Sequence, residues 1–104
     1  MTLPKPYVNL GREHPKLLQA YEAFGSACAA AGPLDAKTVA LVKLAISLGA
    51  GLEGAAHSHC RKAVEAGWTR EELLHLAHLS APTIGFPSMM RNRGWLLDVL
   101  EKDG

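Results

Sequence analysis

The stretch LEGAAHSHCRKAVEAGWTREELLHLAHL, residues 52–79, decides the fold of this chain. Its apolar residues recur every three or four positions, which is the spacing of one face of an α-helix. Gly67 interrupts the pattern at a point where helices commonly end on a residue with positive φ. Thr69 and Glu72 then match a capping box, a pair that satisfies the free amides at a helix start. The stretch therefore predicts one helix over about 52–66 and a second helix that begins at Thr69.

Helical patterns separated by Gly and Pro also occupy the rest of the chain. Asp35 is placed to cap a helix that is apolar around nearly its whole circumference, so we expect this helix to be buried in the centre. No segment alternates between apolar and polar residues with period two, so the predicted fold is all-α. We expect an irregular N-terminal arm at 1–13 and a loop between two prolines at 82–87. The five predicted helices lie at about 15–31, 35–49, 52–66, 69–81 and 88–102.

Length and composition predict one domain that associates with itself. A chain of 104 residues fits a single domain, 1–104, with one core. Apolar residues make up 48% and charged residues 20%, which leaves apolar surface for a partner subunit, so we expect a homo-oligomer. The net charge of +1 comes without a basic stripe, which argues against nucleic acid as a partner.

The same residues favour a cytoplasmic location. No apolar run has the length of a membrane span or the pattern of a secretory signal, so we expect no membrane partner. The only cysteines are Cys28 and Cys60, too few for a disulfide framework. A single bridge between these two thiols stays open as an alternative.

A polar cluster, His57-Ser58-His59-Cys60-Arg61, lies within the predicted helix 52–66. Successive residues of an α-helix rotate by about 100°, so His57 and His59 point to nearly opposite sides. His59 shares its face with small apolar residues. Partial desolvation there disfavours the charged imidazole and suits His59 to act as a general acid or base near neutrality. The alternative is a chemically idle histidine at a helix interface.

Cys60 and its neighbours allow two further hypotheses. The thiol is either a small buried apolar group or a thiolate that is favoured by the imidazoles and the guanidinium of Arg61 nearby. His57 and Cys60 are three residues apart, as are His75 and His78, so these four side chains form a conceivable composite site for a transition metal. No other cofactor is predicted.

Several of these features together resemble the carboxymuconolactone decarboxylase and alkylhydroperoxidase D-like superfamily. The resemblance runs from about His14 to the final helix. It implies an all-helical fold that typically assembles as a dimer, trimer or hexamer, with a site on the central helices near a subunit boundary. The residues that carry it are the helix Leu17–Phe24, the turn Gly32–Thr38, the frame of His59, Ala63 and Gly67, the restart Thr69–Leu73 and the loop Gly85–Pro87.

The peroxidase branch of this superfamily carries Cys-x-x-Cys-x-x-x-His, assisted by a glutamate on the preceding helix. This chain keeps His59, but Leu52 and Ala55 stand at the cysteine positions and Ala40 stands at about the glutamate position. Thiol-disulfide peroxidase chemistry of that type therefore lacks its nucleophile, its resolving thiol and its proton relay.

The decarboxylase branch often has His-x-Arg at this place, and the chain has His59-Cys60-Arg61. The resemblance implies an imidazole that transfers a proton and a guanidinium that holds a carboxylate. The glutamate that usually precedes the histidine by four positions is replaced by Ala55.

We therefore expect a divergent family member that is an enzyme with a small-molecule substrate and with His59, Cys60 and Arg61 as catalytic residues. Its chemistry is predicted to be either hydroperoxide-related oxidation and reduction at Cys60 or proton transfer on a small carboxylate. A non-catalytic oligomeric scaffold and a transition-metal-binding protein are the alternatives.

Overall fold

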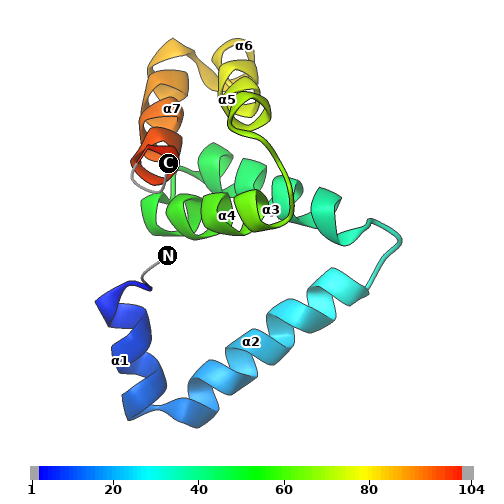
Figure 1. Ribbon diagram of the computed structural model, residues 1–104, viewed down its shortest axis with the longest axis vertical. Coiled ribbons are helices and arrows are strands. Elements are labelled where there is room, and N and C mark those ends of the chain that lie inside the picture. Colours follow the sequence, from blue (N-terminus) through cyan, green and yellow to red (C-terminus); the bar gives the residue numbers. More distant parts are fainter. Residues whose placement is uncertain (1–2, 102–104) are drawn as a thin grey trace. The chain divides into compact units, whose positions relative to one another are not determined.

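The computed structural model describes residues 3–101, and all regular structure within them is helical (Figure 1). The all-α prediction is confirmed. By its internal contacts the chain divides into two units, Met1–Leu34 and Asp35–Gly104, which are described separately. The helices of the described residues are α1 (Lys5–Glu13), α2 (Pro15–Ala30), α3 (Ala36–Ala50), α4 (Glu53–Glu65), α5 (Arg70–Leu79), α6 (Ala81–Ile84) and α7 (Phe86–Leu100).

The first unit consists of α1 and α2. The prediction of an irregular arm over residues 1–13 is wrong for α1, which is helical. Pro6 lies in the first turn of this helix, where the N–H that proline lacks would have no partner within the helix. Tyr7 Oη donates a hydrogen bond of 2.7 Å to Glu22 Oε2 and so links the two helices. Neither helix contains a buried residue. Packing within this unit therefore leaves the apolar side chains of α2 uncovered.

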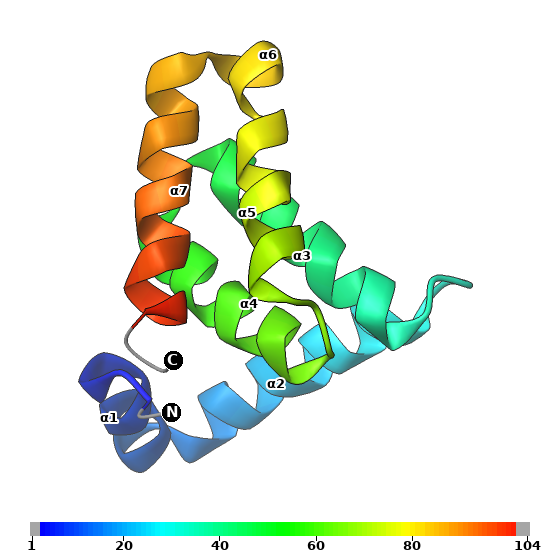
Figure 2. The ribbon, with the colours of Figure 1, turned by 45° about the horizontal axis from the view of Figure 1, so that its top comes forward.

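The second unit contains α3 to α7 and the core. The helix predicted to be central and buried, 35–49, is buried on one face only, since α4 covers that face. Ile46 on the other side of α3 is 64% exposed. α4 packs against both α3 and α7, and α5 lies alongside α7 (Figure 2). The buried apolar residues are Leu44, Leu48, Ala56, Cys60, Ala63, Leu73, Leu74, Ala77, Leu96 and Val99.

The turns on either side of α4 have the same hydrogen-bond pattern. Gly51 has a φ of 71°, and the amide of Leu52 donates to the carbonyl of Ser47 at 3.1 Å. Gly67 has a φ of 106°, and the amide of Trp68 donates to the carbonyl of Ala63 at 3.1 Å. In both turns, carbonyl groups in the last turn of the preceding helix accept hydrogen bonds from the residues that follow it. This arrangement requires a residue with positive φ, which glycine adopts without steric cost.

The predicted helix starts at Asp35 and Thr69 are confirmed. Asp35 Oδ1 accepts from the amide of Thr38 at 2.7 Å. Thr69 Oγ1 accepts from the amide of Glu72 at 3.1 Å, and Glu72 Oε1 accepts from the amide of Thr69 at 2.9 Å. The capping box is thus complete.

The loop predicted between Pro82 and Pro87 is mostly helical in the structure. α6 ends at Ile84 and α7 begins at Phe86, so Gly85, with a φ of 104°, is the only residue between them. Both prolines lie in the first turn of a helix, where they interrupt no hydrogen bond. The prediction was wrong because it treated them as helix breakers.

Buried polar groups connect α7 to the ends of α3 and α5. Asn92 is fully buried; its Oδ1 accepts from Arg91, and its Nδ2 donates to Ser80 Oγ at 3.2 Å. Arg91 Nη2 also donates to the carbonyl of Leu48 at 2.9 Å. These bonds fix the start of α7 relative to α3. No helix within residues 3–101 is long and apolar enough to cross a membrane.

Candidate functional site

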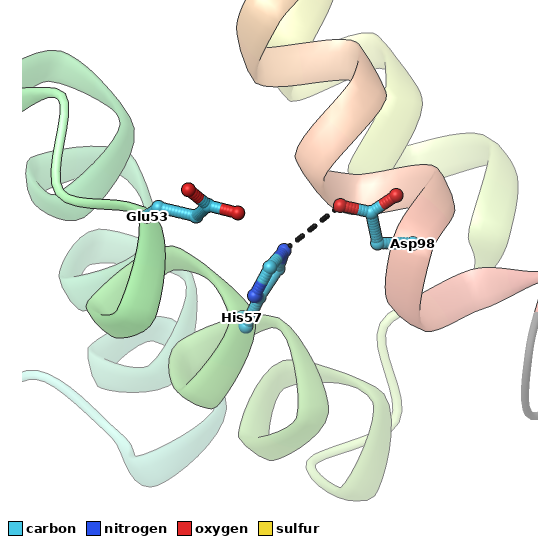
Figure 3. Close-up of side chains that lie close together, drawn as sticks. All are labelled: Glu53, His57 and Asp98. Atoms are coloured by element: carbon cyan, nitrogen blue, oxygen red, sulfur yellow. Dashed lines mark hydrogen bonds and ion pairs between the residues drawn. The ribbon is translucent and has the colours of Figure 1, made fainter. Parts of the chain in front are cut away.

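The polar cluster predicted from the sequence lies on α4, and the helix turns its two histidines toward different neighbours. His57 faces α7, where its Nε2–H donates to Asp98 Oδ2 at 3.0 Å (Figure 3). His59 lies where the positive charge of Lys43 on α3 acts on it. The two imidazoles therefore belong to separate sites on either side of one helix.

His59 is partly buried at the junction of α3 and α4. Burial lowers the pKa of this imidazole, and the positive charges of Lys62 and Lys43 lower the pKa further. All three effects favour the neutral ring, which is the form that accepts a proton. Two cations beside a neutral base are also suited to holding an anion next to it.

The other two predicted catalytic residues are not grouped with His59. Cys60 is fully buried among the core side chains. Arg61 follows His59 by two positions, which is about 200° around a helix, so it lies on the side of α4 that carries His57. The positive charges that act on His59 are those of Lys43 and Lys62, and not that of Arg61 as the sequence interpretation had it.

Lys62 had a signal in the sequence. It lies three residues after His59, and that spacing puts two side chains on one face of a helix. Lys43 had no such signal, because its place beside His59 depends on how α3 packs against α4.

The structure does not assemble the predicted composite metal site. Cys60 lies in the core, whereas His75 and His78 are exposed on α5. Among the described residues, the acidic, histidine and cysteine side chains close enough to share an ion are Glu53, His57 and Asp98 (Figure 3).

The hypothesis of a Cys28 to Cys60 disulfide stays a prediction. Cys28 is exposed on α2 of the first unit, and Cys60 is buried in the second.

The chain matches the carboxymuconolactone decarboxylase family over residues 15–98, from the first residue of α2 almost to the end of α7. It belongs to the carboxymuconolactone decarboxylase family. The resemblance that we based on the frame from His59 to Leu73 is thereby confirmed. Family membership alone does not assign a reaction, because reactions depend on site residues more than on the fold.

Two relatives of this carboxymuconolactone decarboxylase family protein support the assignment. A family member from Legionella pneumophila, solved by crystallography in its apo form, superposes with a TM-score of 0.73 at 27% identity, over 91% of this chain and 84% of that chain. An uncharacterised protein of Haemophilus influenzae is 41% identical over 59 residues, which are 57% of this chain. The match covers 52% of that relative, so the chain spans about half of its length.

Proposed function

We propose that this family member is an enzyme that transfers a proton on a small carboxylate, with His59 as the base. The observation that carries the proposal is the position of His59, partly buried between α3 and α4 with two lysines acting on it. A general base works best when it is neutral at the working pH and close to a site that holds its substrate. The lowered pKa of His59 supports the first condition, and the positive charges of Lys43 and Lys62 support the second.

The lysines supply the recognition part of the proposal. A carboxylate that binds Lys43 and Lys62 places its neighbouring carbon or oxygen within reach of the imidazole. The imidazole then takes a proton from the substrate and returns it at another position, with no net change in protons. The bound carboxylate of the substrate also offsets the repulsion between the two lysines and the imidazolium that forms during proton transfer.

The redox version of the enzyme hypothesis has less support. A peroxide has to reach a thiolate in order to oxidise it, and the side chain of Cys60 is fully buried. We therefore assign Cys60 to the core and base the proposed activity on His59.

The test follows the imidazole ring of His59 by NMR while small carboxylates, including carboxymuconolactone, are added to the whole protein. We expect the His59 signal to shift in a saturable way and the signal of exposed His75 to stay in place. Turnover of the lactone is then compared between the wild type and His59→Gln. A loss of about 100-fold or more is expected, which is the usual contribution of a general base.

His75→Gln is the matched control, since His75 is an exposed imidazole on a different helix, α5. A His59→Gln variant that turns over the lactone at the wild-type rate contradicts the proposal. So does a His59 signal that no carboxylate moves.

We also propose that the protein associates with itself. Leu17, Tyr21 and Phe24 lie on one face of α2 and are 58%, 65% and 68% exposed. An apolar helix face of this kind is typical of a subunit interface. The non-catalytic alternative, an oligomeric scaffold, would use the same face without the proton chemistry.

A further inference from the structure

Three side chains on the α7 side of α4 converge on one point in space. Glu53 and His57 project from α4, and Asp98 projects toward them from α7 (Figure 3). We propose that these three residues form a binding site for a divalent transition-metal ion. This site is separate from the proposed base, because His59 lies on the α3 side of the same helix.

The spacing of the three residues fits ligands of one ion. Glu53 and His57 are four positions apart on one helix, a spacing that puts two side chains on the same face. The ligand atoms of the three residues all lie within 4.8 Å of one another. Neighbouring ligands of an ion lie about 3 to 3.5 Å apart when each is about 2.0 to 2.2 Å from it.

One pair already has this separation, since His57 Nε2 and Asp98 Oδ2 are 3.0 Å apart. An ion about 2.0 to 2.2 Å from both atoms would take the place of the proton that joins them in the hydrogen bond. Glu53 is exposed, and its side chain has the freedom to move closer. Closing the site therefore requires a change of rotamer and no movement of a helix.

The backbone that carries these ligands is well fixed. Glu53 is the first residue of α4, and only the N-cap residue Leu52 separates it from Gly51. Asp98 lies beside Val99 and two residues after Leu96, which are 5% and 0% exposed. A ligand carried on a packed helix keeps its place before the ion arrives, and this lowers the entropic cost of binding.

The donor set selects the class of ion. One imidazole nitrogen and two carboxylate oxygens suit Zn²⁺, Co²⁺ or Mn²⁺, whereas Ca²⁺ and Mg²⁺ prefer oxygen ligands alone. The side chains of His57 and Asp98 are 25% and 54% exposed. Water therefore reaches the site, and an ion held by three protein ligands keeps coordination positions open for water or a further ligand.

The test uses the full-length protein without a histidine tag, in a Cys28→Ser background, because the exposed thiol of Cys28 is itself able to bind metal. Co²⁺ is titrated and followed by its visible absorption, and Zn²⁺ is then added in competition. We expect one Co²⁺ per chain and no thiolate charge-transfer band. Zn²⁺ should displace the bound Co²⁺ even when Mg²⁺ is present in excess.

Three isosteric or near-isosteric variants locate the ion, namely Glu53→Gln, His57→Gln and Asp98→Asn. Each variant is expected to weaken Co²⁺ binding by at least about 10-fold. Substitution of a residue that only supports a metal ligand already causes a loss of this size. The controls are Glu65→Gln, an exposed carboxylate at the other end of α4, and His78→Gln, an exposed imidazole on α5. Both controls should bind Co²⁺ like the parent.

Three outcomes overturn the proposal. In the first, Co²⁺ binding does not saturate. In the second, the Glu53 and Asp98 variants bind Co²⁺ as tightly as the parent. In the third, only a control variant loses binding. Failure of the base proposed at His59 leaves this test unaffected, because the metal titration measures binding and not turnover.

Discussion

The two histidines of the HSH sequence show how one helix divides polar residues between different environments. His57 and His59 are two residues apart, yet His57 is hydrogen-bonded to Asp98 on α7 and His59 is influenced by Lys43 on α3. Between these directions lies the buried line of Ala56, Cys60 and Ala63. The core of the unit thus separates the proposed base from the proposed metal site.

At the residue scale, the burial of Cys60 predicts its reactivity. A disulfide reagent such as Ellman's reagent should modify exposed Cys28 rapidly and Cys60 only after unfolding, because the reagent needs an accessible thiolate. We expect one fast thiol per native chain and two thiols in denaturant. The measurement is the absorbance of the released thiolate over time.

Cys28→Ser provides the control for this prediction. The variant should show no fast phase in the native state, while its single thiol should react fully in denaturant. Two fast thiols in the native wild type would mean that Cys60 is accessible and would restore the hypothesis of hydroperoxide chemistry at that residue.

At the scale of helices, local signals were the most predictable part of the fold. The capping box of Thr69 and Glu72, the cap at Asp35 and the positive φ of Gly67 were all expected, because each depends on residues within four positions of one another. Helix α1 was missed, although Pro6 has a permitted place in its first turn.

The candidate sites were predictable only in part, for a physical reason. The burial of His59 followed from its small apolar neighbours on the same helix face. Asp98, in contrast, lies 41 residues from its partner His57, and helix periodicity carries no information about which helices pack together. The charge of Lys43 likewise acts on His59 only because α3 packs against α4.

The capping box also predicts how stability depends on pH. Hydrogen bonds from Thr69 hold the pKa of Glu72 below its ordinary value. A carboxylate with a lowered folded-state pKa stabilises the fold above its unfolded pKa, about 4.3, and this contribution is lost as the pH falls through the folded value. Between pH 5 and pH 3, Glu72→Gln should therefore lose less free energy of unfolding than the wild type. The difference should be about the contribution that the lowered pKa of this one carboxylate makes to stability.

The measurement is urea unfolding followed by circular dichroism at several pH values. Glu71→Gln is the matched control, because Glu71 is an exposed neighbour in the first turn of α5 outside the capping box. It should keep the wild-type pH dependence. Equal pH slopes for Glu72→Gln and Glu71→Gln would show that the hydrogen bonds to Glu72 do not persist in solution.

At the scale of the whole molecule, the uneven distribution of burial between the two units is the main feature to explain. All ten buried apolar residues of the described chain lie in the unit Asp35–Gly104. α2 nevertheless has the apolar pattern of a helix that is covered on one side, with Leu17, Tyr21 and Phe24 at spacings of four and three. Exposure of three large apolar side chains to water is unfavourable, and a second copy of the chain is the partner that we propose for them.

Phe24→Glu is the variant that tests this proposal, because a charge in the middle of an apolar interface is costly to bury. We expect the wild type to sediment as an oligomer in analytical ultracentrifugation and Phe24→Glu to sediment as a smaller species at the same concentration. Gln19→Glu adds the same charge at another exposed position of α2 and should keep the wild-type size, since Gln19 is not part of the apolar face. If the wild type is monomeric at high micromolar concentration, or if both variants dissociate equally, the apolar face of α2 is not the interface between copies of the chain.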